Sequence, residues 1–494
     1  MKFKAKTASW DKIEVDALAV LVTEEDYQTV TSRMNIKLDG QLHNFLANEG
    51  FSGKEGQFIA FPSGGRLAAK IVYVLGVGKK GDLTLSGLRK LAATLGKKAK
   101  SSGKKTLAID LVSELTPKIA ISDSARVLVE GLELGTYRYE KYKTVDQENK
   151  NELTDVWFLV PPAKLQHITN AITNSQIGVA GTLFARDLIN ESPTITTPTY
   201  LANAAMTLGR QKNIKVEIMD EKDVRKLGMG AYLAVTRGSA EPLKFIKLVY
   251  SGGGKKKIVL AGKGITFDTG GLSLKDAKNM ETMKLDMSGA ATVLGVFSIL
   301  SQLKPAVTVI GLIAACENMP GSRATKPGDI AVAMNGKSIE ILNTDAEGRL
   351  TLADMLSYAV NEKPDYIIDL ATLTGACMVA LGEEVAGLFT NNEKLGDLIT
   401  QAAAESGEKV WQLPLEIEYR ETIKSHIADL RNVATSRYGG AITAALFLEE
   451  FVSNIPWVHM DIAGPAFEEK DTAVNPKGGV GFGVRTLITF LENL

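Results

Sequence analysis

The charged segment at residues 343–350 reads N-T-D-A-E-G-R-L, and an apolar run lies on each side of it. Residues 338–342, just before it, have the β-branched composition of a strand, and the residues after it have helical spacing. In open α/β sheets, ligands bind where a strand leads into a helix. Asp345 and Glu347 repel each other unless a cation lies between them, and Arg349 could bind an anion. Taken alone, such a string is most often a solvated turn.

A second, glycine-rich cluster lies upstream and favours a site instead. The strand predicted over 257–261 delivers Lys263 and Asp268 to a glycine-rich turn. Asp286 lies at the start of the helix expected near Ala290, where an anion is favoured. The charged side chains of the two clusters are Asp268, Asp286, Asp345, Glu347, Lys263, Lys275 and Arg349.

Four carboxylates in one crevice cannot all stay ionised without compensation, and two divalent metals would supply it. The sequence has no H-E-x-x-H motif, so a metal would be held by oxygen ligands, to which one lysine amine could be added. Such ligands suit Mn²⁺ or Mg²⁺, and Zn²⁺ is also possible.

The length and composition are those of an ordinary globular protein with more than one core. At 494 residues, two domains are expected. Lys+Arg and Asp+Glu are both 57, so no global field favours nucleic acid or an anionic membrane surface. No signal peptide and no membrane span is expected, which predicts a cytoplasmic protein. Cys316 and Cys377 lie in apolar runs and are expected to be buried and reduced.

Apolar runs alternate with helical patterns along the whole chain, which predicts an α/β fold with two domains. We expect a smaller N-terminal α/β domain over 1–162, a connecting helix over 163–190, and a larger C-terminal catalytic α/β domain over 191–494 with a central, mostly parallel sheet. The expected strands are 17–22, 71–75, 107–112, 156–160, 257–261, 307–314, 366–370 and 457–462. The expected helices are 85–99, 122–134, 165–189, 290–303, 351–360 and 441–452.

Several motifs together resemble the leucyl aminopeptidase (cytosol aminopeptidase) family. The octapeptide at 343–350 is close to diagnostic, and the resemblance covers essentially residues 180–490. The motifs are G-K-G (262–264), F-D-T-G-G (267–271), Lys275, M-K-L-D-M (283–287), E-N-M-P (317–320), P-G-D-I (327–330), A-T-L-T-G-A (371–376) and D-I-A-G (461–464).

The resemblance implies a two-metal aminopeptidase that removes the N-terminal residue, with leucine-like residues preferred, from short peptides. Asp268 and Glu347 match carboxylates that bridge both metals. Lys263 and Asp286 match ligands of one metal, and Asp345 matches a ligand of the other. Two such metals can share one water and lower its pKa, so that the bridging hydroxide attacks the peptide carbonyl.

The resemblance also implies roles for groups around the metals. Lys275 matches the lysine that polarises the scissile carbonyl, where an oxyanion forms. Arg349 matches the arginine that holds bicarbonate, the general base. The positions that match the substrate-binding residues are Met283, Thr372, Leu373, Gly375 and Ala463. The family assembles as homohexamers, each a dimer of trimers, so this assembly is expected here too.

The sequence departs from the family pattern at a few positions. Thr269 replaces the common serine and Leu285 the usual alanine. Pro465-Ala466 stands where some relatives have a larger side chain, which could change the shape of the side-chain pocket.

Two other functions compete with a peptidase. A nucleic-acid-binding or scaffold role could use a basic patch of Lys97, Lys98, Lys100, Lys104 and Lys105, although a solvated helix face and turn explains these lysines better. Phosphoryl transfer also uses two metals, but the sequence lacks a phosphate cradle.

Overall fold

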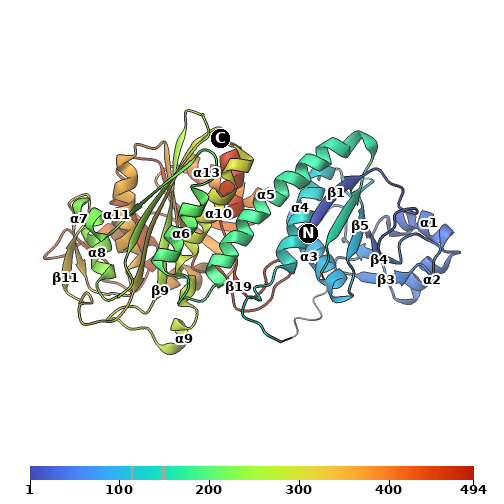
Figure 1. Cartoon of the computed structure of the whole chain (residues 1–494). Coiled ribbons are helices and arrows are strands. Elements are labelled where there is room, and N and C mark those ends of the chain that lie inside the picture. The colour runs from blue at the N-terminus through green and yellow to red at the C-terminus, as the bar shows by residue number, and fades with distance from the viewer. Residues whose placement is uncertain (113–114, 146–151) are drawn as a thin grey trace. The chain divides into compact units, whose positions relative to one another are not determined.

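The computed structural model describes residues 1–112, 115–145 and 152–494 and divides into two compact α/β units (Figure 1). The first unit contains residues 1–179 and 471–476, and the second contains 180–470 and 477–494. The helix predicted over 165–189 is α5 (Leu165–Asn190), which follows the short turn η1 (Pro162–Lys164). The prediction of two α/β domains is confirmed, while the limits predicted at 162 and 191 stay predictions.

In the first unit, a sheet with the order β1-β6-β5-β2-β4-β3 lies between two helical layers in the described residues. All its pairings are parallel except that of β3 with β4. One apolar core lies between the sheet and the helices α3 and α4, and another lies on the side of α1 and α2. The strands are β1 (Lys2–Lys6), β2 (Ala17–Val22), β3 (Phe58–Pro62), β4 (Ile71–Gly76), β5 (Thr106–Asp110) and β6 (Asp155–Leu159). The helices are α1 (Tyr27–Lys37), α2 (Gln41–Asn48), α3 (Leu85–Ser101) and α4 (Ile121–Thr136).

The segment 471–476 returns to the first unit from the far end of the sequence. Lys97 in α3 donates through Nζ to the backbone oxygen of Thr472 at 2.6 Å. Arg138, just after α4, lies 3.4 Å from Asp471. The first unit is therefore closed by residues that the sequence pattern assigns to the second.

The second unit is built on a sheet with the order β15-β14-β17-β13-β9-β10-β8-β7. Its middle strands β17, β13, β9 and β10 are parallel, and antiparallel pairings join β14 to β17 and β8 to β10 and β7. This agrees with the predicted central, mostly parallel sheet. The strands are β7 (Ile214–Met219), β8 (Lys244–Ser251), β9 (Lys257–Asp268), β10 (Thr308–Asn318), β13 (Tyr366–Ala371), β14 (Val385–Thr390), β15 (Lys409–Gln412) and β17 (Trp457–Asp461).

Helices cover both faces of this sheet (Figure 1). One face carries α6 (Pro198–Leu208), α10 (Ser288–Leu303), α13 (Glu393–Ser406) and α15 (Val484–Glu492). The other face carries α8 (Gly230–Thr236), α11 (Gly348–Asn361) and α14 (Gly440–Glu449). The remaining helical segments are α7 (Glu221–Lys226), α9 (Ala277–Met280), η2 (Met283–Met287), α12 (Gly375–Leu381) and η3 (Ile417–Ile423).

One described helical segment, Met283–Leu303, is long and apolar enough to cross a membrane. Its most apolar window is 78% buried inside the protein, as expected of a core helix. Cys316 and Cys377 are both buried and unpaired with each other, as the sequence predicts.

One expectation about the strands near the charged segments is wrong. The strand predicted to end at Ala261 continues to Asp268, so Lys263 lies inside β9 and not in a turn. Glycines are needed there because of close packing, since a Cβ on Gly262 would lie 2.4 Å from the backbone oxygen of Gly289.

The strand predicted over 338–342 is confirmed as β12 (Ser338–Ile341), and it lies outside the large sheet. It pairs with β11 (Asp329–Val332) and β16 (Leu430–Arg431) in a separate three-stranded sheet of the described chain. A further small pair consists of β18 (Phe467–Glu468) and β19 (Gly478–Gly479). The octapeptide is therefore supported by a sheet of its own.

Candidate functional site

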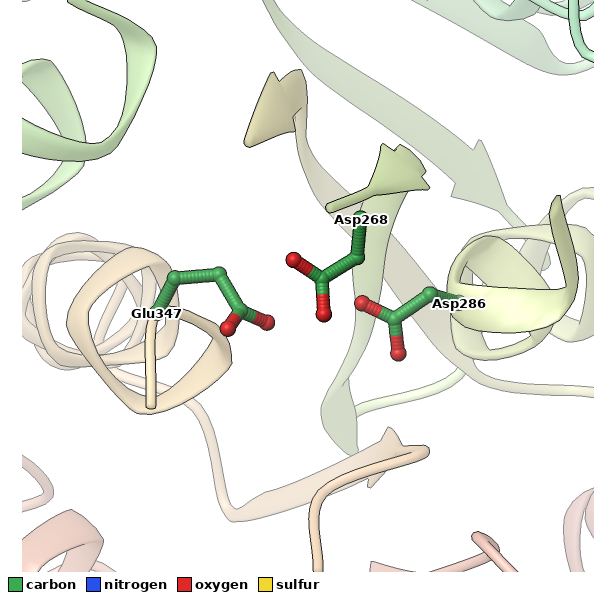
Figure 2. A group of neighbouring side chains, drawn as sticks. All are labelled: Asp268, Asp286 and Glu347. Atoms are coloured by element: carbon green, nitrogen blue, oxygen red, sulfur yellow. The ribbon is translucent and has the colours of Figure 1, made fainter. Parts of the chain in front are cut away.

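Three carboxylates from different elements meet beyond the end of β9 (Figure 2). Asp268 is the last residue of β9, Asp286 lies in η2, and Glu347 immediately precedes α11. All three are buried, and each offers an oxygen within 4.8 Å of the oxygens offered by the others. A cluster of this kind is a candidate site for a cation.

Lys263 enters this cluster from inside β9. Its Nζ lies 2.7 Å from Asp286 Oδ1 and 2.9 Å from Glu347 Oε1. Burial alone would lower the pKa of Lys263, but the carboxylates of Asp286, Glu347 and Asp268 outweigh it and raise that pKa above its ordinary value. Gly348 makes room for the lysine, because a Cβ there would lie 2.5 Å from Lys263 Cε.

Lys275 links Asp268 to the fourth carboxylate, Asp345. Its Nζ lies 2.8 Å from Asp268 Oδ2 and 2.5 Å from Asp345 Oδ1. The chain turns back towards Asp345 through Gly270 and Gly271, whose φ angles of +86° and +64° favour glycine. Burial raises the pKa of the Asp345 carboxyl, and the neighbouring ammonium of Lys275 partly offsets this rise.

Hydrogen bonds connect the two charged segments directly. Asn318, the last residue of β10, donates through Nδ2 to Asp268 Oδ1 at 2.8 Å and to the backbone oxygen of Thr344 at 3.0 Å. Thr344 in turn donates through Oγ1 to the backbone oxygen of Gly270 at 2.7 Å and accepts from the N–H of Ser273 at 2.8 Å. These bonds fix the positions of the two segments relative to each other.

The donors present fit divalent cations. In the part of the chain that the structure describes, Asp286 Oδ2 and Glu347 Oε2 are buried without a hydrogen-bond partner. Burial raises the pKa of both carboxyl groups, so a second positive charge beside them would be favoured. Carboxylate oxygens are the ligands that Mn²⁺ and Mg²⁺ prefer.

Arg349 lies in the first turn of α11 and is buried. Its Nη1 donates to the backbone oxygen of Asn432 at 2.9 Å. Burial lowers the pKa of Arg349 to about 10, because a buried guanidinium lacks the solvation that favours its charge. An anion at this guanidinium would compensate for that loss.

The predicted substrate-binding residues lie on loops that follow β13 and β17. Thr372 is tied to the cluster, because its Oγ1 donates to Asp286 Oδ1 at 2.7 Å and its backbone oxygen accepts from Lys263 at 2.9 Å. Leu373 and Ala463 both donate through backbone N–H to Asp461 Oδ1, at 3.1 and 3.2 Å.

The other two predicted substrate-binding residues are less closely connected. Gly375 is exposed and begins α12. Met283 is half-buried and begins η2, three residues before Asp286. Gly375 has no side chain and Met283 offers only a weakly accepting sulfur, so the roles expected of them rest on shape.

The departures from the family pattern are accommodated inside the protein. Thr269 Oγ1 donates to the backbone oxygen of Asn318 at 2.8 Å. Leu285 and Ala466 are buried. Among the lysines of the basic patch, Lys98 is exposed in the last turn of α3, as a solvated helix face predicts, whereas Lys97 is half-buried and donates to the backbone oxygen of Thr472.

Three residues were missed as parts of the site: Asn318, Asp461 and Asn432. Asn318 and Asp461 end two strands that neighbour β9 or β13, so the rule that ligands bind at the carboxyl ends of parallel strands could have found them. Asn432 follows the two-residue strand β16, which leaves no pattern in the sequence.

Two family models match the chain: the catalytic domain of the cytosol aminopeptidase family over residues 183–488, and its N-terminal domain over residues 19–146. A probable cytosol aminopeptidase of Alkaliphilus oremlandii is 41% identical over 499 residues, which covers 100% of both chains. Another from Persephonella marina is 44% identical over 458 residues and 92% of both.

Solved structures agree with these relatives. A mutant of tomato leucine aminopeptidase matches with a TM-score of 0.89 and 36% identity, over 100% of this chain and 97% of that one. The bottromycin maturation enzyme BotP in complex with Mn matches with a TM-score of 0.86 and 32% identity, over 97% and 99%. This chain therefore belongs to the cytosol aminopeptidase family and is a metal-dependent aminopeptidase.

Proposed function

We propose that this aminopeptidase uses two divalent cations to release leucine-like N-terminal residues from short peptides. The observation that carries the proposal is the convergence of Asp268, Asp286 and Glu347 in one buried cluster, with Asp345 joined to it through Lys275. The manganese in the BotP structure supports Mn²⁺, and Zn²⁺ or Mg²⁺ are the alternatives.

The carboxylates divide between two cation positions in this proposal. Asp268 and Glu347 would contact both cations, Asp286 and a deprotonated Lys263 would hold one, and Asp345 would hold the other. Without a cation the carboxylates keep Lys263 protonated, whereas a dication beside it would favour loss of that proton. When bound, the cations would make a water acidic enough to act as the nucleophile near neutral pH and would polarise the peptide carbonyl. The unpartnered oxygens of Asp286 and Glu347 support this assignment.

Lys275 and Arg349 would act on the substrate and on the proton. Once a cation compensates Asp268 and Asp345, the Lys275 ammonium is available to donate to the oxygen on which negative charge develops. Arg349 would hold a bicarbonate ion, the general base of the proposed reaction, through guanidinium N–H groups other than the one bonded to Asn432.

The loops after β13 and β17 would bind the peptide. Thr372, Leu373 and Gly375 would contact the peptide backbone, and Met283 and Ala463 would line the pocket for the first side chain together with Thr372. Because Thr372 bonds Asp286, the side-chain pocket would be fixed relative to the cations. Contacts of this kind would select the N-terminal residue of a peptide.

We also propose a cytoplasmic homohexamer, built as a dimer of trimers. The exposed apolar residues Ile330 and Val332 on β11, with 47% and 54% of their surfaces accessible, support a contact between subunits. Light scattering in solution tests this assembly, and an active monomer would contradict it.

The experiment that tests the function is hydrolysis of leucyl p-nitroanilide by the wild type and by Asp345→Asn. Each protein is stripped of metal by a chelator and then titrated with Mn²⁺, Zn²⁺ and Mg²⁺. We expect activity that returns with metal in the wild type and stays low in the variant. A folded wild type that binds metal but releases no leucine from the anilide or from leucyl dipeptides would refute the proposal.

A further inference from the structure

Asn432 is a fully buried polar residue, with 0% of its surface exposed, that lies beside the octapeptide. It directly follows β16, which pairs in parallel with β12, and its N–H donates to the backbone oxygen of Glu340 at 3.0 Å. This register places Asn432 next to the point where β12 ends and the segment with Asp345 and Glu347 begins.

The side chain of Asn432 bonds this segment through both ends of its amide. Its Oδ1 accepts from the N–H of Leu342 at 2.9 Å and of Asn343 at 3.3 Å. Its Nδ2 donates to the backbone oxygens of Asn343 at 2.6 Å and Ala346 at 3.4 Å. One planar group therefore spans the turn from its first residue to the residue before Glu347.

The backbone of the same residue holds the guanidinium of Arg349, which donates to the Asn432 oxygen at 2.9 Å. Asn432 thus contacts the segment before Asp345, between Asp345 and Glu347, and after Glu347. A shift of this residue would move the carboxylates of Asp345 and Glu347 and the guanidinium of Arg349 together.

An amide is the group that these partners require. A carboxylate would keep the acceptor for Leu342 and Asn343 but would repel the carbonyl oxygens of Asn343 and Ala346. An apolar side chain would leave these buried backbone groups without partners, which is unfavourable enough to distort the turn.

We propose that Asn432 is a positioning residue that fixes the turn carrying Asp345 and Glu347 and orients Arg349. The inference rests on the proposed function, because it assigns these carboxylates to cations. Residues that hold metal ligands in place typically affect metal affinity by about 10–100-fold.

The test is a calorimetric Mn²⁺ titration of the stripped wild type, Asn432→Ala, Asn432→Asp and a control, Asn391→Ala. The control variant loses two hydrogen bonds between an asparagine side chain and the backbone, because the Asn391 side chain accepts from the N–H of Trp457 at 2.8 Å and donates to the backbone oxygen of Ile455 at 3.0 Å. We expect Mn²⁺ affinity to fall at least about tenfold in Asn432→Ala, less in Asn432→Asp, and less than about threefold in the control.

A general structural role would lower the melting temperature without changing Mn²⁺ affinity, so wild-type affinity in folded Asn432→Ala would overturn the inference. If that variant does not fold, unchanged affinity in Asn432→Asp overturns it instead. A wild type that binds Mn²⁺ but releases no leucine from leucyl p-nitroanilide or from leucyl dipeptides refutes the proposed function, while the affinities of the variants still decide the inference. If the wild type binds no Mn²⁺, the same titrations with Zn²⁺ and Mg²⁺ decide, and a wild type that binds none of the three cations overturns both.

Discussion

A variant of Asp461 can test substrate binding separately from metal binding. Its carboxylate accepts from the N–H groups of Leu373, Thr374 and Ala463 at 3.1, 3.4 and 3.2 Å, and from Thr374 Oγ1 at 2.7 Å. Through these bonds it joins the loop after β13 to the loop after β17. We predict that Asp461→Ala raises KM for leucyl substrates while Mn²⁺ affinity changes little.

The magnitude follows from the bonds that are lost. The bonds from Leu373, Ala463 and the Thr374 hydroxyl are the shorter ones, Asp461 itself is fully buried, and a typical hydrogen bond is worth roughly 1 kcal/mol. Asp461→Ala should therefore lower the free energy of unfolding by about 3 kcal/mol. A displacement of the loops by about 1 Å would reduce kcat/KM by roughly a hundredfold.

Asp461→Asn is the matched variant, because an amide oxygen can still accept the bonds that Oδ1 receives. We expect it to lower kcat/KM by about tenfold or less, since it loses the charge and keeps the geometry. Steady-state hydrolysis of leucyl p-nitroanilide at saturating Mn²⁺ gives KM and kcat separately, and urea denaturation gives stability.

Mn²⁺ affinity should stay near that of the wild type in both variants. Thr372 is held by its bonds to Asp286 and Lys263, and neither bond involves Asp461. The reasoning is refuted if folded Asp461→Ala keeps the wild-type KM, or if its defect disappears when more Mn²⁺ is added.

Three further predictions follow from the site and its surroundings. Gly348→Ala should weaken Mn²⁺ binding by at least about tenfold because its Cβ would displace Lys263, whereas Gly81→Ala, with open space around the new Cβ, should bind Mn²⁺ normally in the same titration. Lys275→Gln should lower kcat by about 10²–10³-fold at saturating metal, and a kcat within threefold of the wild type would contradict its proposed role. Burial raises the pKa of Asp354 to about 7, so the folded protein keeps a proton there that the unfolded chain releases above about pH 4. The free energy of unfolding should therefore fall as pH rises through this window, by up to about 1.4 kcal/mol per pH unit. Urea denaturation at a series of pH values measures this dependence, which should be weaker in Asp354→Asn; an equal dependence on pH in the two proteins would contradict the prediction.

The sequence predicted correctly those parts of the fold and the site that local patterns and residue chemistry indicate together. The octapeptide lies between a strand and a helix as predicted, and Asp268, Asp286 and Glu347 come together as their motifs imply. The order of apolar runs also predicted the central parallel strands, because strands covered on both faces are continuously apolar.

The sequence did not predict features that depend on packing between residues far apart in the chain. The glycine of the G-K-G motif that lies before Lys263 suggested a turn, yet Gly262 lies inside β9 because α10 begins against its backbone. Asn432 acts through a two-residue strand whose partner is far away in the sequence, so no local pattern marks it. Such residues become visible only when the register of the small sheet is known.

The segment 471–476 has a consequence for the synthesis of the protein. Lys97 and its acceptor Thr472 are 375 residues apart. At about 5–20 residues per second, roughly 20–75 s pass on the ribosome between the appearance of the lysine and that of its partner. During this interval the sheet of the first unit can form, but the end of α3 lacks the segment that closes it. The part of the chain that is made first is therefore completed only when translation is nearly over.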